Sequence, residues 1–221
     1  MTEAPPAAES AATGGHDPTA PASPDGVRLR AREAGLCAAL RMLSDGAGAG
    51  IPQGPGGHVV ALDRPGVPQA ATELRLDGGT LTFGAAPQGL EGNPPAPPAW
   101  TAGLAWLRLG CSERLLASCL GYLGERTAGG SPLLVQQMVR GQLAEVRGSQ
   151  LEAELVLGAG AGPDVLQDVH EALTRADRVL CRLLGASSVL ESGPGQEAYA
   201  SELLADVYTP APFQRTREAA L

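Results

Sequence analysis

The stretch ERTAGGSPLLVQQ, residues 125–137, carries the most specific chemistry in this sequence. Arg126 closes an apolar helical pattern, and Pro132 and Gln137 follow it after a pair of glycines. Because a guanidinium offers a fork of charged donors, Arg126 suits a pyrophosphate group. The alternative is a cation at the carboxyl end of a helix, where it stabilises the helix dipole. Gln137 alone indicates little, since a glutamine on a helix surface is ordinary.

Two histidines are the remaining candidates for acid–base chemistry. His58 precedes a short apolar run, and His170 lies at the edge of an apolar stripe, between Asp168 and Glu171. For each, a solvated or hydrogen-bonded histidine is the more ordinary interpretation. The four cysteines have no metal-binding spacing and are interpreted as small hydrophobes, which favours a reducing, cytoplasmic location.

Composition excludes several classes of function. The net charge is −8 with no basic cluster, so the positive surface that nucleic acid requires is missing. We expect no signal peptide and no membrane span, since no apolar window reaches the roughly 18 residues that a span needs. Lysine is absent from the sequence, and isoleucine and asparagine occur once each, which indicates a GC-rich genome.

The elements that must position these residues follow from periodicity. Residues 1–26 are rich in Pro, Ala and Gly, and we expect a disordered tail. Residues 27–44 predict an amphipathic helix with Leu29, Leu36, Leu40 and Leu43 on one face. A short strand is predicted at 58–63 and a hairpin with a glycine turn at 72–84, followed by a linker at 84–99. The hairpin is too small to stand alone, so another element must cover its apolar face.

From residue 100 the pattern is helical. Helices are predicted at 101–125, 133–157, 163–184 and 196–208, and the expected apolar positions include Met138 and Leu155 in the second and Val165 in the third. Short Gly/Pro turns between them predict an antiparallel bundle. The fold class is therefore mainly α, with a β-hairpin remnant. The expected divisions are a tail at 1–26, a helix with the remnant of a β domain at 27–99, and the bundle at 100–215.

The order of these elements and several motifs resemble the C-terminal half of the acyl-CoA dehydrogenases, over about residues 72–215. That family's corner motif R-x-x-F-G-x-P-L-x-x-F-Q is similar to residues 126–137, which keep Arg126, Gly130, Pro132-Leu133 and Gln137. Its Q-x-x-G-G motif matches residues 182–186 with two changes, and its closing Y-E-G-T-S-x-I-Q-R resembles residues 208–215. An unrelated helical bundle is the alternative.

The resemblance implies contacts from Arg126 and Gln137 to the FAD of an adjacent subunit. It also implies removal of two hydrogens beside a thioester carbonyl, with a carboxylate as the base. In most family members that base follows the tyrosine of the closing motif, where this chain has Thr209. In others it lies on the first C-terminal helix, at a position near Trp100, with Glu113 far from that register. Neither of these two positions therefore carries a carboxylate that could act as the base.

These observations favour a degenerate acyl-CoA dehydrogenase-like subunit that assembles with a full-length flavoprotein and acts on an acyl thioester. FAD would then be shared only at the interface with the partner, and none is expected on the isolated chain. The alternatives are a flavin-independent enzyme acting on a biosynthetic acyl intermediate, which a closed pocket lined by His170 or Glu113 would favour, and a non-catalytic scaffold. We expect a homo-oligomer or hetero-oligomer, and a bacterial protein of secondary metabolism.

Overall fold

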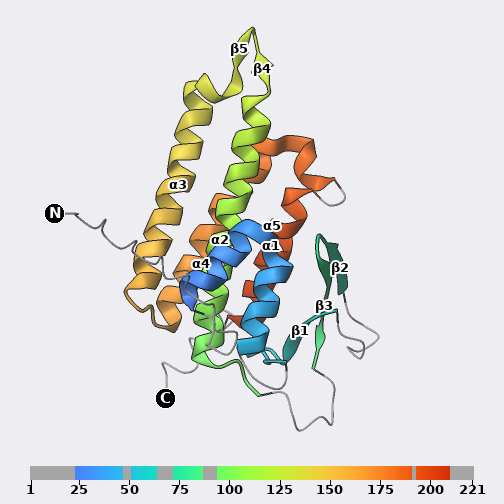
Figure 1. Ribbon diagram of the computed structural model, residues 1–221. Coiled ribbons are helices and arrows are strands. Elements are labelled where there is room, and N and C mark those ends of the chain that lie inside the picture. Colours follow the sequence, from blue (N-terminus) through green and yellow to red (C-terminus); the bar gives the residue numbers. More distant parts are fainter. Residues whose placement is uncertain (1–22, 47–50, 64–71, 87–93, 191–192, 210–221) are drawn as a thin grey trace, which may run out of the picture.

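The protein is an antiparallel helical bundle with a small sheet and one additional helix on its flank (Figure 1). The computed structural model describes residues 23–46, 51–63, 72–86, 94–190 and 193–209. The bundle helices are α2 (Pro98–Gly124), α3 (Gln137–Gly158), α4 (Pro163–Leu184) and α5 (Pro194–Tyr208). The other elements are α1 (Pro24–Gly46), β1 (His58–Leu62), β2 (Thr72–Leu76), β3 (Gly79–Ala85), β4 (Thr127–Ala128), β5 (Ser131–Pro132) and the 3-10 turns Leu133–Val135 and Gly185–Val189. The predicted fold class, mainly α with an antiparallel bundle and a β-hairpin, is confirmed.

Helix α2 is the centre of the molecule. It contacts each of α1, α3, α4 and α5, and Leu104, Leu107 and Leu109 are all completely buried. Every residue from Gly103 to Glu113 is buried, so this part of α2 has no solvent face, which is the pattern of a central helix. The three apolar clusters of the core all take side chains from α2, so this helix positions every other element.

Helix α1 changes direction at Gly35, where φ is +83° and ψ is 176° (Figure 1). Because the kink resets the helical phase, Val27 and Ala31 are buried before it and Leu36 and Leu40 after it. The predicted placement of Leu29 on the apolar face was wrong, since this side chain is 46% exposed. The helix also begins at Pro24, inside the range predicted as a tail, and residues 1–22 of that tail lie outside the described residues.

The predicted hairpin is β2 and β3, and β1 adds a third antiparallel strand in the order β1-β3-β2. Gly78 has φ +91° in the tight turn between β2 and β3, a conformation that glycine adopts without a steric cost. Val60 lies opposite Phe83, and both join Leu81 in a core cluster with α1, α2 and α5. These helices cover the apolar face that the hairpin could not cover itself.

The helices of the bundle match the predicted ranges, with α4 at the expected bounds and α3 beginning four residues late at Gln137. Two side chains predicted to face the core do not, since Met138 is 81% and Leu155 is 75% exposed. Among the helices, α3 packs mainly on α2 and α4, and its buried residues lie along one narrow line through Val146 and Ala153. Val165 is also exposed, because Leu166 takes the inward position on α4.

Candidate functional site

The corner predicted from the sequence projects from one end of the bundle (Figure 1). Helix α2 ends at Gly124, and β4 and β5 form a two-stranded hairpin around Gly129 and Gly130. Both glycines have positive φ, at 61° and 81°, as a two-residue hairpin turn of this kind requires. No described atom lies within 4 Å of a Cβ built on either glycine, so the backbone of the turn is open to a large ligand or a partner.

Arg126 lies at the start of this hairpin and is exposed. Its Nη1 donates to the carbonyl oxygen of Tyr122 at 3.0 Å, and its guanidinium carbon lies 3.4 Å from the centroid of the Tyr122 ring. The arginine therefore does contact its own helix end, as the dipole interpretation expects. No carboxylate among the described residues pairs with it, and most of its donors are not used by the fold.

Gln137 is the first residue of α3 and is also exposed at this end. The preceding Gln136 does not cap the helix with its side chain, so the first amide groups of α3 have no side-chain acceptor. A shallow hollow of about 480 Å³ lies between Val135, Gln137, Arg140 and Gly141. The corner thus presents two arginines and a helix N-terminus, an arrangement that favours an anionic group.

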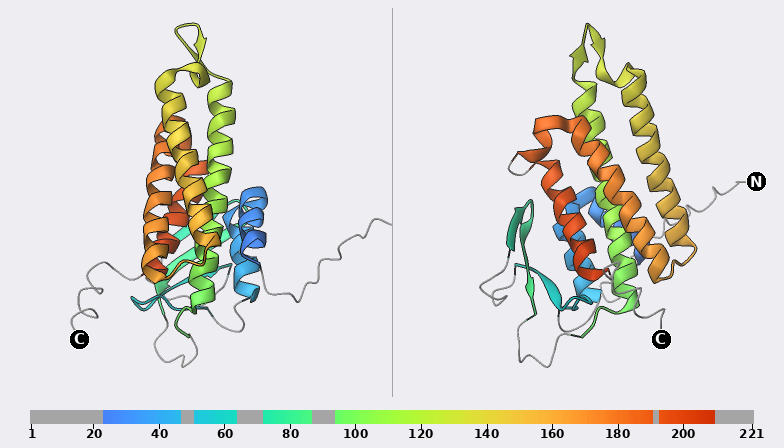
Figure 2. Two further views of the ribbon diagram at one scale, coloured as in Figure 1. Left: turned by 90° about the vertical axis from the view of Figure 1, so that its left-hand side faces the viewer. Right: turned by 180° about the vertical axis from the view of Figure 1, so that it is seen from behind.

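The 182–186 segment reaches the same end of the molecule. Helices α2 and α4 run in the same direction, so the carboxyl end of α4 lies at the end where α2 terminates (Figure 2). Gly185 ends α4 with φ +60°. The antiparallel bundle therefore brings to one end the corner and the segment that resembles the Q-x-x-G-G motif.

The two positions at which the resemblance places a base are neighbours at the other end of the bundle. The rings of Trp100 and Tyr208 lie 5.5 Å apart between centroids, and Thr209 follows directly on Tyr208. The hydroxyl of Tyr208 donates to the carbonyl oxygen of Pro52 at 3.1 Å, and burial raises its pKa to about 12. The Thr209 hydroxyl donates to the Ala205 carbonyl at 2.6 Å. An aromatic pair and a helix-bound hydroxyl thus occupy both positions.

A small cavity of about 150 Å³ opens beside Trp100. Asp45, at the end of α1, is the acidic side chain among the described residues that line it, and it is exposed to solvent. The cavity is well below the roughly 300 Å³ at which ligand pockets usually begin.

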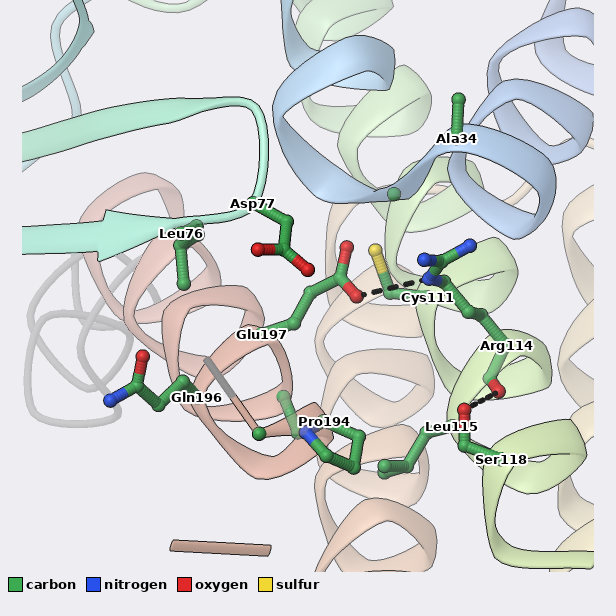
Figure 3. Close-up of a pocket in the computed structure, with 13 residues that line it drawn as sticks. Ala34, Leu76, Asp77, Cys111, Arg114, Leu115, Ser118, Pro194, Gln196 and Glu197 are labelled. Carbon is green, nitrogen blue, oxygen red and sulfur yellow. Dashed lines mark hydrogen bonds and ion pairs between the residues drawn. The ribbon is translucent and has the colours of Figure 1, made fainter. Parts of the chain in front are cut away.

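A separate cavity of about 250 Å³ lies between α1, α2, α5 and the turn of β2 and β3 (Figure 3). Glu197 and Asp77 point into it with Arg114 and Cys111 (Figure 3). One Glu197 oxygen accepts from the Leu36 amide, which the kink of α1 leaves without a helical partner, and the other lies 3.4 Å from Arg114 Nε. Burial raises the pKa of Glu197, and burial keeps the pKa of the Cys111 thiol well above its usual range.

Sequence reasoning missed Glu197. Its one local signal is an acidic residue in the first turn of a helix, which by itself indicates a favourable dipole interaction. Its carboxylate accepts from the Leu36 amide at the kink of α1 and packs against Gly35, where a Cβ would lie 2.7 Å from it. These contacts assign Glu197 to holding the kink. Both carboxylate oxygens are occupied by these structural contacts.

The other sequence candidates are separated in the structure. His58 is exposed at the start of β1, while His170 is buried on α4 against Arg108 of α2. Glu113 is 7% exposed and accepts from Arg28 at 2.6 Å and Arg147 at 3.1 Å, so it joins α1, α2 and α3 in an ion-pair network. These contacts assign Glu113 to the packing of the helices.

Two classes of site find no support in the described part of the chain. No group of three or more His, Cys, Asp or Glu side chains is arranged there to hold a metal ion. Among the described helices, none has the length and apolar character that crossing a membrane requires. The four cysteines are free, and three of them are buried as the sequence predicts.

No family model matches the chain, and no curated protein matches it. Among solved structures it is similar to a glutaryl-CoA dehydrogenase from Mycobacterium smegmatis in complex with FADH2, with 16% identity, a TM-score of 0.47, and coverage of 74% of this chain and 58% of the other. It is similar to a steroid acyl-CoA dehydrogenase variant, with 21% identity, a TM-score of 0.43, and coverage of 73% and 54%. It is also similar to a butyryl-CoA dehydrogenase from Megasphaera elsdenii, with 16% identity, a TM-score of 0.40, and coverage of 69% of this chain and 45% of the other.

These matches are to the family whose motifs the sequence resembles. The chain spans about half the length of the solved structures that it matches. The activities and ligands in those descriptions belong to those proteins.

Proposed function

We propose that this protein is a degenerate acyl-CoA dehydrogenase-like subunit. It assembles with a full-length flavoprotein dehydrogenase that acts on an acyl thioester, and it contributes contacts to the FAD of its partner without a catalytic base of its own. The observation that carries the proposal is the difference in residues between the two ends of the bundle. The corner end keeps Arg126 and Gln137 exposed, while the other end has Trp100 and Thr209 where a carboxylate would be needed.

The corner fits one part of FAD, the pyrophosphate. Arg126 offers unused donors of its guanidinium fork, and Arg140 and the amide end of α3 add positive potential nearby. FAD, when bound, supplies the chemistry that accepts a hydride. This chain's own sheet has three short strands whose apolar side chains are used to pack against α1, α2 and α5. The rest of the cofactor site is therefore assigned to the partner.

Exposed apolar side chains at the corner end support an interface there. Val135 and Met138 follow the hairpin and are 59% and 81% exposed, and Val189 and Leu190 beyond α4 are 79% and 61% exposed. Val135 and Met138 are close together in the chain beside the corner, and neighbouring exposed apolar side chains favour a site that binds another protein. A homo-oligomer built through this end and a hetero-oligomer with the flavoprotein both use this surface, and the hetero-oligomer supplies the FAD.

The flavin-independent alternative depended on a closed pocket lined by His170 or Glu113. His170 lines a hollow that is open to solvent, and Glu113 lines a shallow groove in which its carboxylate is already paired with arginines. These observations do not favour that alternative. A non-catalytic scaffold would share the exposed corner end but would have no use for cofactor contacts, so flavin binding separates it from the proposal. The cytoplasmic location stays a prediction.

Co-purification tests the proposal. The tagged chain is expressed alone and together with each full-length acyl-CoA dehydrogenase encoded near it in its genome, and the mass and flavin absorbance of each product are measured. We expect a colourless chain alone and a yellow complex of fixed stoichiometry with one of these proteins. Stoichiometric FAD on the isolated chain, or no complex with any of them, would overturn the proposal.

A further inference from the structure

Arg108 is a completely buried cation whose contacts are all to neutral groups. Its Nε donates to the Ser201 hydroxyl at 3.0 Å, and its Nη2 donates to the Thr174 hydroxyl at 2.9 Å. Its Nη1 donates to the carbonyl oxygen of His170 and lies 3.2 Å from His170 Nδ1. Within the described residues no carboxylate pairs directly with this guanidinium, although a buried charge normally has an ionic partner.

The acidic groups that act on Arg108 do so from a distance. Asp177 on α4 is buried, and Glu202 and Asp206 lie on α5, and all three raise the pKa of Arg108 while burial lowers it. Burial raises the pKa of Asp177 to about 6, so Asp177 is ionised only above about that pH, and it then compensates Arg108 without a direct contact. A contact between Arg108 and an anionic oxygen is thus the interaction that the fold does not supply.

The tautomer of His170 follows from its contact with Arg108. Since the guanidinium has only N–H donors, His170 Nδ1 must accept, and the ring proton of the neutral imidazole then lies on Nε2. Burial and the nearby guanidinium lower the pKa of His170 to about 3, which keeps the ring neutral. Nε2 is buried and finds no acceptor among the described residues. An orphaned buried donor of this kind calls for an acceptor from outside the fold.

Arg108 and His170 form part of the wall of a hollow of about 520 Å³ between α4 and α5, called here the α4–α5 hollow. On its rim Arg178 pairs with Glu202, and Arg175 lies 3.7 Å from Glu171. Of the charged side chains that line the hollow, Arg108 and Asp206 are in neither of these pairs. Asp206 is exposed to solvent, so Arg108 is the unpaired charge that is buried. The corner carrying Arg126 lies at the opposite end of the bundle from Thr209, which also lines the hollow.

We propose that the α4–α5 hollow is a binding site for a small organic carboxylate, whose oxygen accepts from His170 Nε2 and whose charge compensates Arg108. A carboxylate is favoured over a neutral carbonyl because hydrogen bonds involving charged groups are about twice as strong as neutral ones. It is favoured over a phosphate dianion because Glu202 and Asp206 on the α5 side oppose each negative charge that enters, and a carboxylate brings one where the dianion brings two.

The test uses the full chain labelled with ¹⁵N at its three histidines and titrated with sodium butyrate. Butyramide, which has the same carbon chain without the charge, is the matched control ligand. The ring nitrogen signals report the His170 tautomer directly, and the variant His170→Gln assigns them. We expect a saturable shift at His170 with butyrate, no comparable shift at exposed His58, and affinity for butyramide at least about tenfold weaker.

Variants keep the result interpretable. Because His170→Gln removes the reporting signal, butyrate binding by the variants is measured by isothermal titration calorimetry. His170→Gln should weaken it, while Arg175→Gln on the rim should change it by less than about threefold, the scale of a weak exposed charge. The assignment is overturned if shifts at His170 and His58 are equal and do not saturate. It is also overturned if butyramide binds as well as butyrate, since a neutral polar site or a buried water would then satisfy His170.

Discussion

The variant Arg126→Ala separates the two roles that the structure allows for this residue. In the isolated chain it removes the hydrogen bond to the Tyr122 carbonyl, the contact with the Tyr122 ring, and a cation at the end of α2. An exposed cation–π contact contributes ~0.5–1 kcal/mol and a helix-end cation ~0.3–1 kcal/mol. Because one solvated guanidinium makes both, we expect a loss of about 1 kcal/mol, or roughly 2–4 °C in Tm.

In the complex with a flavoprotein the same change removes charged hydrogen bonds to a pyrophosphate. Such a bond contributes about 1.5–3 kcal/mol, so FAD should dissociate roughly 10- to 150-fold more readily. Arg126→Lys sharpens the comparison, because lysine keeps the positive charge near Tyr122 but loses the guanidinium fork. It should restore most of the Tm of the isolated chain and little of the flavin retention.

Calorimetry of the chain and equilibrium dialysis of the complex against FAD-free buffer measure the two quantities on the same proteins. Arg30→Ala removes an exposed arginine of α1 and is the matched control, with both quantities expected at wild-type values. If Arg126→Ala lowers Tm while FAD retention stays within about twofold of wild type, the arginine serves its own helix alone and the reasoning is refuted.

Three further predictions concern packing, pH and assembly. Gly110→Ala should destabilise the chain by several kcal/mol, on the order of a disrupted core contact, because its Cβ would lie 2.3 Å from the Arg28 carbonyl oxygen. The Cβ of Gly121→Ala on the same helix meets nothing within 4 Å, so this variant should be more stable by about 0.5–1 kcal/mol. Urea unfolding of both variants measures the two effects. Burial raises the pKa of Asp177 from 3.8 to about 6, so the folded state binds this proton more tightly than the unfolded chain, and the resulting stability is lost as pH rises from about 4 to about 6. Asp177→Asn should remove this loss, a difference of roughly 3 kcal/mol in the free energy of unfolding across that range. If the free energies of unfolding of the two proteins change with pH in parallel, the prediction is contradicted. Met138→Arg should weaken assembly, measured as a lower mass in light scattering, and change the free energy of unfolding by no more than about 0.5 kcal/mol. Leu155→Glu at the other end of α3 should leave the mass of the assembly unchanged, and equal effects of both variants would place the interface elsewhere.

The elements with a strong local signal were predicted well from the sequence. Helix α4 has a clear apolar stripe, and the sequence predicted its bounds as Pro163–Leu184. The glycine turn of the hairpin was equally clear. Helix α1 was predicted without its kink, because the phase change at Gly35 depends on Glu197, which is distant in the sequence. Periodicity also misplaced Met138, since a helix at the edge of a bundle buries a narrower line than its apolar residues suggest.

The candidate sites divide in the same way. The sequence could bring Arg126 and Gln137 to one end of the bundle, because antiparallel order and short turns fix which ends meet. It could not predict the buried contacts of Arg108, whose partners come from α4 and α5. His170 was correctly seen at the edge of an apolar stripe, but its tautomer depends on an arginine 62 residues away. Such long-range polar contacts leave no periodic pattern in a sequence.

The most direct test of the proposed role is the flavin content of the partner in complexes with the wild-type chain and with the Arg126→Ala chain. The full-length flavoprotein that co-purifies with the chain is prepared as both complexes, and bound FAD per partner subunit is measured by absorbance after dialysis. The account predicts that FAD is retained more strongly in the complex with the wild-type chain than in the complex with the Arg126→Ala chain, and that the isolated chain is colourless. Equal retention in these two complexes, or FAD bound to the chain alone, would contradict it.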